Sequence, residues 1–68
     1  MMYDVVSNFT YHAPKDDQPR RYEDIRNIAK GMAEFIVAHC PESREQSLAL
    51  TKLEESVFWA NASIARHE

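Results

Sequence analysis

Residues 19–40 read PRRYEDIRNIAKGMAEFIVAHC, and residues 41–66 read PESREQSLALTKLEESVFWANASIAR. In each segment one row of residues recurs at steps of three and four, the spacing of a single face of an α-helix. In the first segment this row is Ile25, Ile28, Met32, Phe35 and His39. In the second segment it is Leu50, Leu53, Val57, Ala60 and Ile64. The pattern predicts two helices, over about residues 19–39 and 44–66.

Local chemistry sets the ends of these helices. Pro19 suits the first helical position, where its missing N–H costs nothing. Pro41 ends the first helix, because the residue before a proline disfavours the α conformation. Ser43 and Gln46 have the spacing of a capping box, in which each side chain bonds the backbone N–H of the other residue. The connection between the helices is therefore short, and we expect them to be antiparallel neighbours.

The first 18 residues show no sustained period. Residues 13–19 read APKDDQP, which is turn and loop chemistry. We therefore expect an irregular N-terminal arm over residues 1–18 and a helical hairpin over residues 19–68, within a single domain. The predicted fold class is all-α: an antiparallel two-helix hairpin with an irregular N-terminal arm.

The small size of the chain makes self-association the expected source of stability. A chain of 68 residues has a marginal core, and such chains usually depend on disulfides, a metal or partner subunits. The single cysteine, Cys40, cannot form an internal disulfide, and the three histidines lack metal-ligand spacing. We expect the two rows to form the seam of the hairpin. Both helices carry further apolar residues, including Phe58 and Trp59, and apolar surface of this kind usually marks an interface. We expect a compact homo-oligomer; a hairpin that leaves Phe58 or Trp59 in water is the alternative.

Composition and charge exclude several classes. The formal net charge of −3 argues against a protein that binds DNA or RNA polymers, which usually has a basic excess. No apolar run approaches the roughly 20 residues of a membrane span, and the first residues lack the features of a signal peptide. A free cysteine fits the reducing cytoplasm. We expect a cytoplasmic protein with no membrane partner.

Catalytic motifs are also missing. The sequence has no Gly-rich phosphate loop, no HExxH and no GxSxG. Cys40 follows His39 directly, and adjacent residues on a helix do not face each other. We expect no enzyme, no cofactor, no catalytic residue and no metal site.

Arginines stand where helix dipoles disfavour them. Arg20 and Arg21 lie at the start of the first helix and Arg44 at the start of the second, although helix N-termini prefer anions. One interpretation is that a phosphate accompanies them, because free N–H groups at a helix start bind phosphate. The other is that nearby acidic residues neutralise them; these are Glu23, Asp24, Glu42 and Glu45.

Two rows of polar side chains are further candidates. Tyr22, Arg26 and Lys30 follow one another at steps of four, and an aromatic ring beside two cations suits a nucleotide. Arg44, Ser47 and Thr51 form a row of one cation and two hydroxyls, which would suit phosphate if several copies met around a symmetry axis. The alternative for each row is an ordinary solvated helix face.

Several strings resemble a known family. They are FTYHAP at 9–14, RYE at 21–23, IR at 25–26, SREQSLALTKLEE at 43–55 and WANASIAR at 59–66. These strings resemble short phage proteins with the anti-CBASS/anti-Thoeris helical hairpin. That family is similar to phage nucleotide sponges, which assemble as homo-hexamers and sequester cyclic oligonucleotide or cyclic ADP-ribose-type immune messengers without cleaving them.

The resemblance implies two kinds of site. Tyr11 matches an aromatic of the arm that stacks on cyclic dinucleotides, and Arg26 matches a cation of the first helix, where better-characterised members have lysine. Lysine and arginine hold phosphate differently, so this exchange bears on ligand preference. Arg44, Ser47 and Thr51 fall where cyclic trinucleotides would bind on a three-fold axis. Tyr22 and Lys30 join the ligand-binding candidates through their spacing alone.

The resulting expectation is a phage sponge acting in the cytoplasm of the infected bacterium. It would bind cyclic di- or trinucleotides, or cyclic ADP-ribose-type messengers, and so block host defence. The alternative from another class is a protein–protein interaction module that binds a host protein through Phe58 and Trp59. A small nucleotide hydrolase is a third hypothesis.

Overall fold

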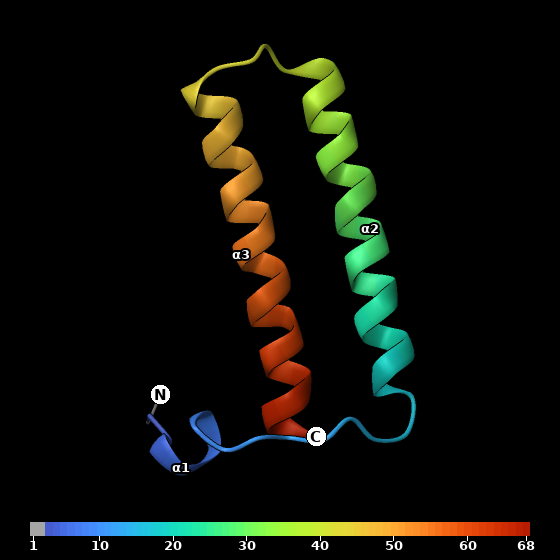
Figure 1. The fold of residues 1–68 in the computed structure, drawn as a ribbon, viewed down its shortest axis with the longest axis vertical. Coiled ribbons are helices and arrows are strands. Elements are labelled where there is room, and N and C mark those ends of the chain that lie inside the picture. Colours follow the sequence, from blue (N-terminus) through green and yellow to red (C-terminus); the bar gives the residue numbers. More distant parts are fainter. Residues whose placement is uncertain (1–2) are drawn as a thin grey trace.

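The computed structural model describes residues 3–68 and contains three helices. They are α1 (Val5–Asn8), α2 (Gln18–His39) and α3 (Arg44–His67). The two long helices lie side by side, joined at one end by the loop of residues 40–43, and α1 lies beside the far end of α3 (Figure 1). The all-helical class and the hairpin are confirmed.

The first residues fold differently from the expectation. The arm was expected to be irregular throughout, but Val5–Asn8 forms one helical turn. Asp4 caps this turn, because its Oδ1 accepts a hydrogen bond from the backbone N–H of Ser7 at 3.0 Å. A ring nitrogen of His12 lies 2.8 Å from the carbonyl oxygen of Ser7, and this contact holds the segment that follows α1 against the helical turn. A local cap, which needs no long apolar period, explains why periodicity missed this helix.

The start of α2 lies one residue before the expected position. Gln18 is the first helical residue, and Pro19 follows it inside the first turn. The backbone N–H of Gln18 donates to the carbonyl of Lys15 at 2.9 Å, and its side-chain oxygen accepts from the backbone N–H of Lys15 at 3.1 Å. Gln18 is 3% exposed and is the only fully buried residue among residues 3–68. These reciprocal bonds close the turn that leads into the hairpin.

The loop between the long helices follows the predicted chemistry in part. Cys40 is extended, as expected before Pro41, and the Oγ of Ser43 accepts from the backbone N–H of Gln46 at 3.1 Å. The prediction that the Gln46 side chain bonds the backbone N–H of Ser43 is wrong. The Gln46 side chain instead donates to the carbonyl of Cys40 at 2.9 Å. That carbonyl belongs to a loop residue with no helical partner, so the amide satisfies an acceptor rather than a donor.

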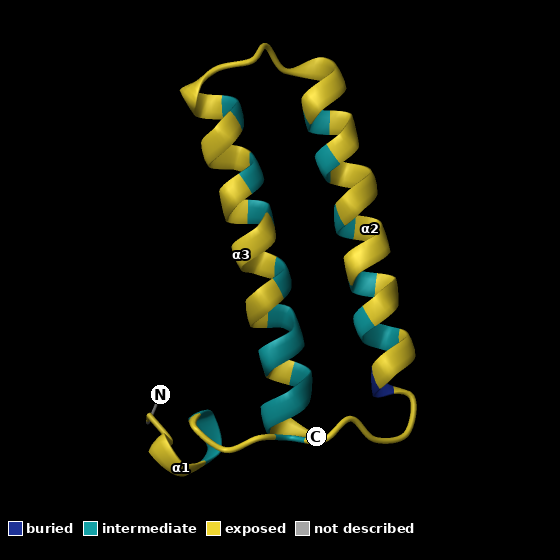
Figure 2. Ribbon diagram, in the orientation of Figure 1, coloured by how far each residue is buried: buried dark blue, intermediate teal, exposed yellow. Residues whose placement is uncertain are grey.

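The seam between the long helices uses the expected face of α3. The five residues of the predicted row on α3 are all half-buried (Figure 2). On α2 the expectation was wrong, apart from Ile25. Ile28, Met32 and Phe35 are 76%, 56% and 63% exposed. The half-buried row of α2 is instead Tyr22, Ile25, Ala29, Ala33 and Ile36.

Small side chains explain which row of α2 faces α3. Both rows have helical spacing, but the inner one places Ala29 and Ala33 in the middle of the seam. Alanines allow two helices to approach closely, whereas the larger side chains of the outer row would hold them apart. No apolar residue among residues 3–68 is fully buried, so the hairpin leaves a large apolar surface exposed. No helix in this range has the length and apolar character required to cross a bilayer.

Candidate functional site

A groove of about 610 Å³ lies between α2 and α3. Arg26 and Lys30 contribute from α2, and Thr51, Glu54 and Phe58 contribute from α3. The remaining lining residues are Asn61 and the seam residues Ala29, Ala33, Leu50, Leu53 and Val57. The groove therefore has an apolar lining, two cations from one helix and an aromatic ring from the other.

A smaller hollow of about 330 Å³ continues the groove toward the start of α2. Tyr22, Arg26 and Asn61 line it, together with Ala62 and Ala65. Arg26 and Asn61 line both spaces, so they stand where the two meet. The hollow adds a second aromatic ring to the same side of the hairpin.

The two cations of the groove have no acidic partner among the residues that the structure describes. Neither Arg26 nor Lys30 forms an ion pair with any residue in the range 3–68. Glu54 lines the same groove without pairing to either of them. A cation that stays unpaired beside an aromatic ring and an apolar lining is suited to an anionic ligand that carries a flat ring system.

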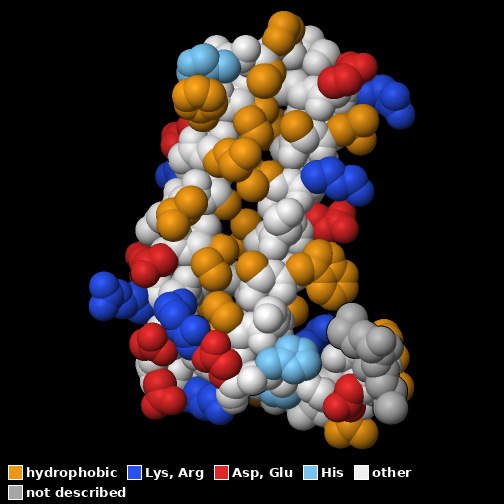
Figure 3. Space-filling view, turned by 180° about the vertical axis from the view of Figure 1, so that it is seen from behind, with side chains coloured by type: hydrophobic (Ala, Val, Ile, Leu, Met, Phe, Trp, Pro, Cys, Tyr) orange, Lys and Arg blue, Asp and Glu red, His pale blue; other side chains and the backbone are white. Residues whose placement is uncertain are grey.

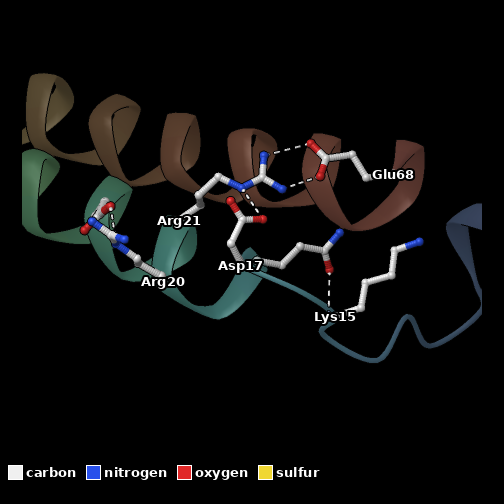
Figure 4. Close-up of polar contacts among 7 residues, drawn as sticks. Lys15, Asp17, Arg20, Arg21 and Glu68 are labelled. Atoms are coloured by element: carbon white, nitrogen blue, oxygen red, sulfur yellow. Dashed lines mark hydrogen bonds and ion pairs between the residues drawn. The ribbon is translucent and has the colours of Figure 1, made fainter.

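The arginines at the start of α2 are, by contrast, already paired (Figure 4). Arg20 lies 4.0 Å from Asp24, which is the local neutralisation that the sequence allowed. Arg21 binds Asp17 at 3.3 Å and also the carboxylate of Glu68, at the far end of the chain. Both arginines therefore lie beside carboxylates: Arg20 beside one of the acidic residues expected to neutralise it, and Arg21 beside two others.

The structure brings some of the sequence candidates together and leaves others apart. Tyr22, Arg26 and Lys30 line the continuous groove and hollow, and Thr51 joins them from the second predicted row. Arg44, Ser47 and Tyr11 do not line this groove. The single chain therefore combines residues from two predicted sites in one place.

Sequence reasoning missed two residues of the groove. The sequence predicts Phe58 only as interface surface, toward other copies or toward a host protein, and it carries no prediction for Asn61. Phe58 stands seven residues after Thr51, which places both on one stripe of α3. Asn61 is a polar residue beside the apolar row of that helix. Both signals were present in the spacing, but their meaning depended on which face of α2 lay opposite.

Comparison with known families gives one match. The family model described as the Acb2/Tad1 hairpin domain matches residues 3–65. The chain belongs to the Acb2/Tad1 hairpin family. The resemblance seen in the sequence is thereby confirmed. No curated protein and no solved structure gives a significant match.

The Acb2/Tad1 family comprises phage anti-CBASS and anti-Thoeris sponges, which counter host defence by binding cyclic nucleotide signals. The match spans the arm, α2 and nearly all of α3, so it includes every residue of the groove. A cyclic nucleotide combines phosphates with flat bases. The two cations and the Phe58 ring of the groove, with the Tyr22 ring of the adjoining hollow, fit this ligand class.

Proposed function

We propose that this chain is a sponge for cyclic di- or trinucleotides or cyclic ADP-ribose-type messengers, which it holds without cleaving them. The observation that carries the proposal is that Arg26 and Lys30 line one side of a groove and the ring of Phe58 lines the other. A sponge needs affinity rather than turnover. In this proposal the protein acts in the cytoplasm of an infected bacterium, and neither a membrane nor a nucleic-acid polymer is its partner.

In the proposed complex, the groove binds one nucleotide unit through two kinds of contact. Arg26 and Lys30 hold phosphate oxygens with charge-assisted hydrogen bonds. The ring of Phe58, and that of Tyr22 in the adjoining hollow, offers a face to a base. Thr51 supplies a hydroxyl, and Glu54 is an acceptor for a ribose hydroxyl or a base amine.

The remaining candidates require a second copy of the chain in this proposal. Tyr11 is 83% exposed, and we propose that it stacks on a ligand held partly by a neighbouring protomer. Arg44 and Ser47 are also exposed at the start of α3. Together with Thr51, they would form a cyclic trinucleotide site where three protomers meet.

The proposed assembly is a homo-hexamer of antiparallel hairpins. Its support is the absence of a fully buried apolar residue within residues 3–68, together with the apolar side chains along both helices (Figure 3). The exposed row of Ile28, Met32 and Phe35 flanks the seam on the side away from Arg26 and Lys30. Packing of copies through this row would leave the groove open to ligand.

Ligand recovery tests the function. The protein is mixed with cyclic di-AMP, cyclic tri-AMP or cyclic ADP-ribose, and the unbound ligand is removed by filtration and quantified. The bound fraction is then released by heating and identified by mass spectrometry. Depletion of the free ligand followed by its intact return supports the sponge.

Other outcomes would contradict the proposal. A hydrolase would return cleaved products, and a protein–protein interaction module would leave every ligand unbound. Arg26→Ala should lose the depletion, whereas Arg20→Ala should keep it, because Arg20 is paired with Asp24 outside the groove. Equal behaviour of these two variants would remove Arg26 from the site.

A further inference from the structure

Asn61 is a polar residue at a half-buried position of α3, beside the apolar seam. It lies next to Ala60 of the seam row and four residues after Val57. Its side-chain oxygen, Oδ1, is enclosed by the protein and has no hydrogen-bond partner among the residues that the structure describes. Enclosed carbonyl groups normally have a partner, because an unpaired one loses its hydration without compensation. Packing of the hairpin alone does not explain this amide.

The position of Asn61 points to a ligand. Asn61 and Arg26 are the two residues that line both the groove and its adjoining hollow. In a nucleotide the base is held a short distance from the phosphate by its sugar. A base in the groove, with its phosphate at Arg26, would therefore lie close to the Asn61 amide.

The chemistry of the amide suits the edge of a base. A carboxamide presents one acceptor and two donors, and a half-turn about its last bond exchanges them. Base edges present adjacent donors and acceptors, and asparagine pairs with them through two hydrogen bonds. The rings of Phe58 and Tyr22 contact only the flat face of a base, and stacking tolerates every base.

We propose that Asn61 determines which base the groove accepts, by hydrogen bonding to the base edge. This inference rests on the proposed sponge function. In it, Arg26 and Lys30 hold any cyclic nucleotide through its phosphates. Asn61 then discriminates among them: the half-turn about its last bond carries the enclosed, unpartnered oxygen to the groove, where it pairs with the matching base.

Calorimetry with three ligands of one phosphate backbone tests the proposal. Cyclic di-AMP, cyclic di-GMP and cyclic di-UMP are titrated into the parent protein, Asn61→Leu and the control Asn27→Leu. Asn27 is an exposed amide of α2 that does not line the groove. We expect the parent and Asn27→Leu to share one ranking of the ligands. Asn61→Leu should bind the preferred ligand about tenfold or more weakly, and the three affinities should converge.

Several results would overturn the inference. An unchanged ranking in Asn61→Leu, or a parent that binds all three bases equally, would show that Asn61 does not read bases. Equal weakening for every ligand with a changed oligomeric state by light scattering would assign Asn61 to helix register instead. Binding of no cyclic nucleotide by the parent or by Asn27→Leu would defeat the sponge function itself, and the inference with it.

A second variant keeps the test open if Asn61→Leu does not fold, as judged by circular dichroism. Asn61→Asp preserves the shape of the side chain and replaces its N–H donors with an acceptor. We expect it to change the ranking toward the base that offers the most donors. A folded Asn61→Asp protein with the parental ranking would overturn the inference.

Discussion

The guanidinium of Arg21 donates two hydrogen bonds to the carboxylate of Glu68, which joins the first turn of α2 to the end of α3 (Figure 4). The bond from Nη1 to Oε2 is 2.9 Å long, and Nη2 binds Oε1. Asp17 adds a third oxygen, 3.3 Å from Nε. Arg21 and Glu68 are 47 positions apart, and their contact closes the end of the hairpin opposite the loop.

This contact predicts a dependence of stability on pH. The hydrogen bonds from Arg21 hold the pKa of Glu68 below its ordinary value of 4.5. These bonds therefore stabilise the fold fully above the pKa that Glu68 has in the unfolded chain. Their contribution is lost as the pH falls through the lower pKa that Glu68 has in the folded protein. We expect Glu68→Gln to lower the unfolding temperature at neutral pH and to match the parent in strong acid.

Thermal unfolding followed by circular dichroism, over about pH 2.5 to 7, measures this difference. Glu55→Gln is the matched control, because Glu55 pairs with Lys52 within α3 at 3.6 Å and joins no two helices. The effect should be small, since both side chains of the Arg21–Glu68 pair remain partly exposed. A difference between Glu68→Gln and the parent that stays constant across this range would contradict the assignment.

Removal of the groove's arginine should weaken ligand binding and its response to salt. Arg26→Ala removes a charge-assisted contact worth about 1.5–3 kcal/mol, so the affinity for cyclic dinucleotides should fall by at least about tenfold. The slope of affinity against salt should also become shallower, because one cation fewer meets phosphate. Calorimetry at two salt concentrations checks both results. Unchanged affinity and slope would place the ligand elsewhere.

The ring of Phe58 should contribute through stacking. Phe58→Ala should reduce cyclic dinucleotide affinity by about 1–3 kcal/mol, the usual loss for one stack between a base and an aromatic ring. Phe58→Tyr keeps the ring and should bind like the parent. Pyrophosphate, which has no base, should bind both variants alike. A loss for pyrophosphate in Phe58→Ala would indicate a damaged groove rather than a lost stack.

A charge on the outer row of α2 should dissociate the assembly. Met32 is 56% exposed in the single chain, and we propose that it lies between copies. Met32→Asp would bury an unpaired carboxylate there, which costs several kcal/mol in such interfaces. Light scattering should then report the 7.9 kDa monomer. Asn27→Asp, on an exposed position, should leave the mass of the parent unchanged, and a monomeric parent would contradict the interface.

The start of α3 should matter for cyclic trinucleotides alone. Arg44 forms no ion pair within residues 3–68 and does not line the groove. Arg44→Glu would replace attraction by repulsion at each of three protomers around an axis, so cyclic tri-AMP binding should be lost. Cyclic dinucleotide binding should persist. Equal loss of both ligands would indicate disrupted assembly, and loss of neither would leave Arg44 as a solvated residue.

Local chemistry in the sequence was enough to define the long helices. Pro41 stops α2 and Ser43 caps α3, and both act through backbone geometry within a few residues. The seam of α3 was also predictable, because one apolar row dominates that helix. The family could be recognised from strings of residues, since these do not depend on contacts.

The face that α2 turns toward α3 could be decided only by the tertiary structure. Two rows on α2 have the same helical spacing, and the choice between them depends on how closely Ala29 and Ala33 let α3 approach. That choice places Thr51 and Phe58 beside Arg26, and it leaves Ile28 exposed. Contacts such as that of Arg21 with Glu68 likewise follow from the pairing of the helices, because spacing along a chain carries no information about which residues of a second helix lie opposite.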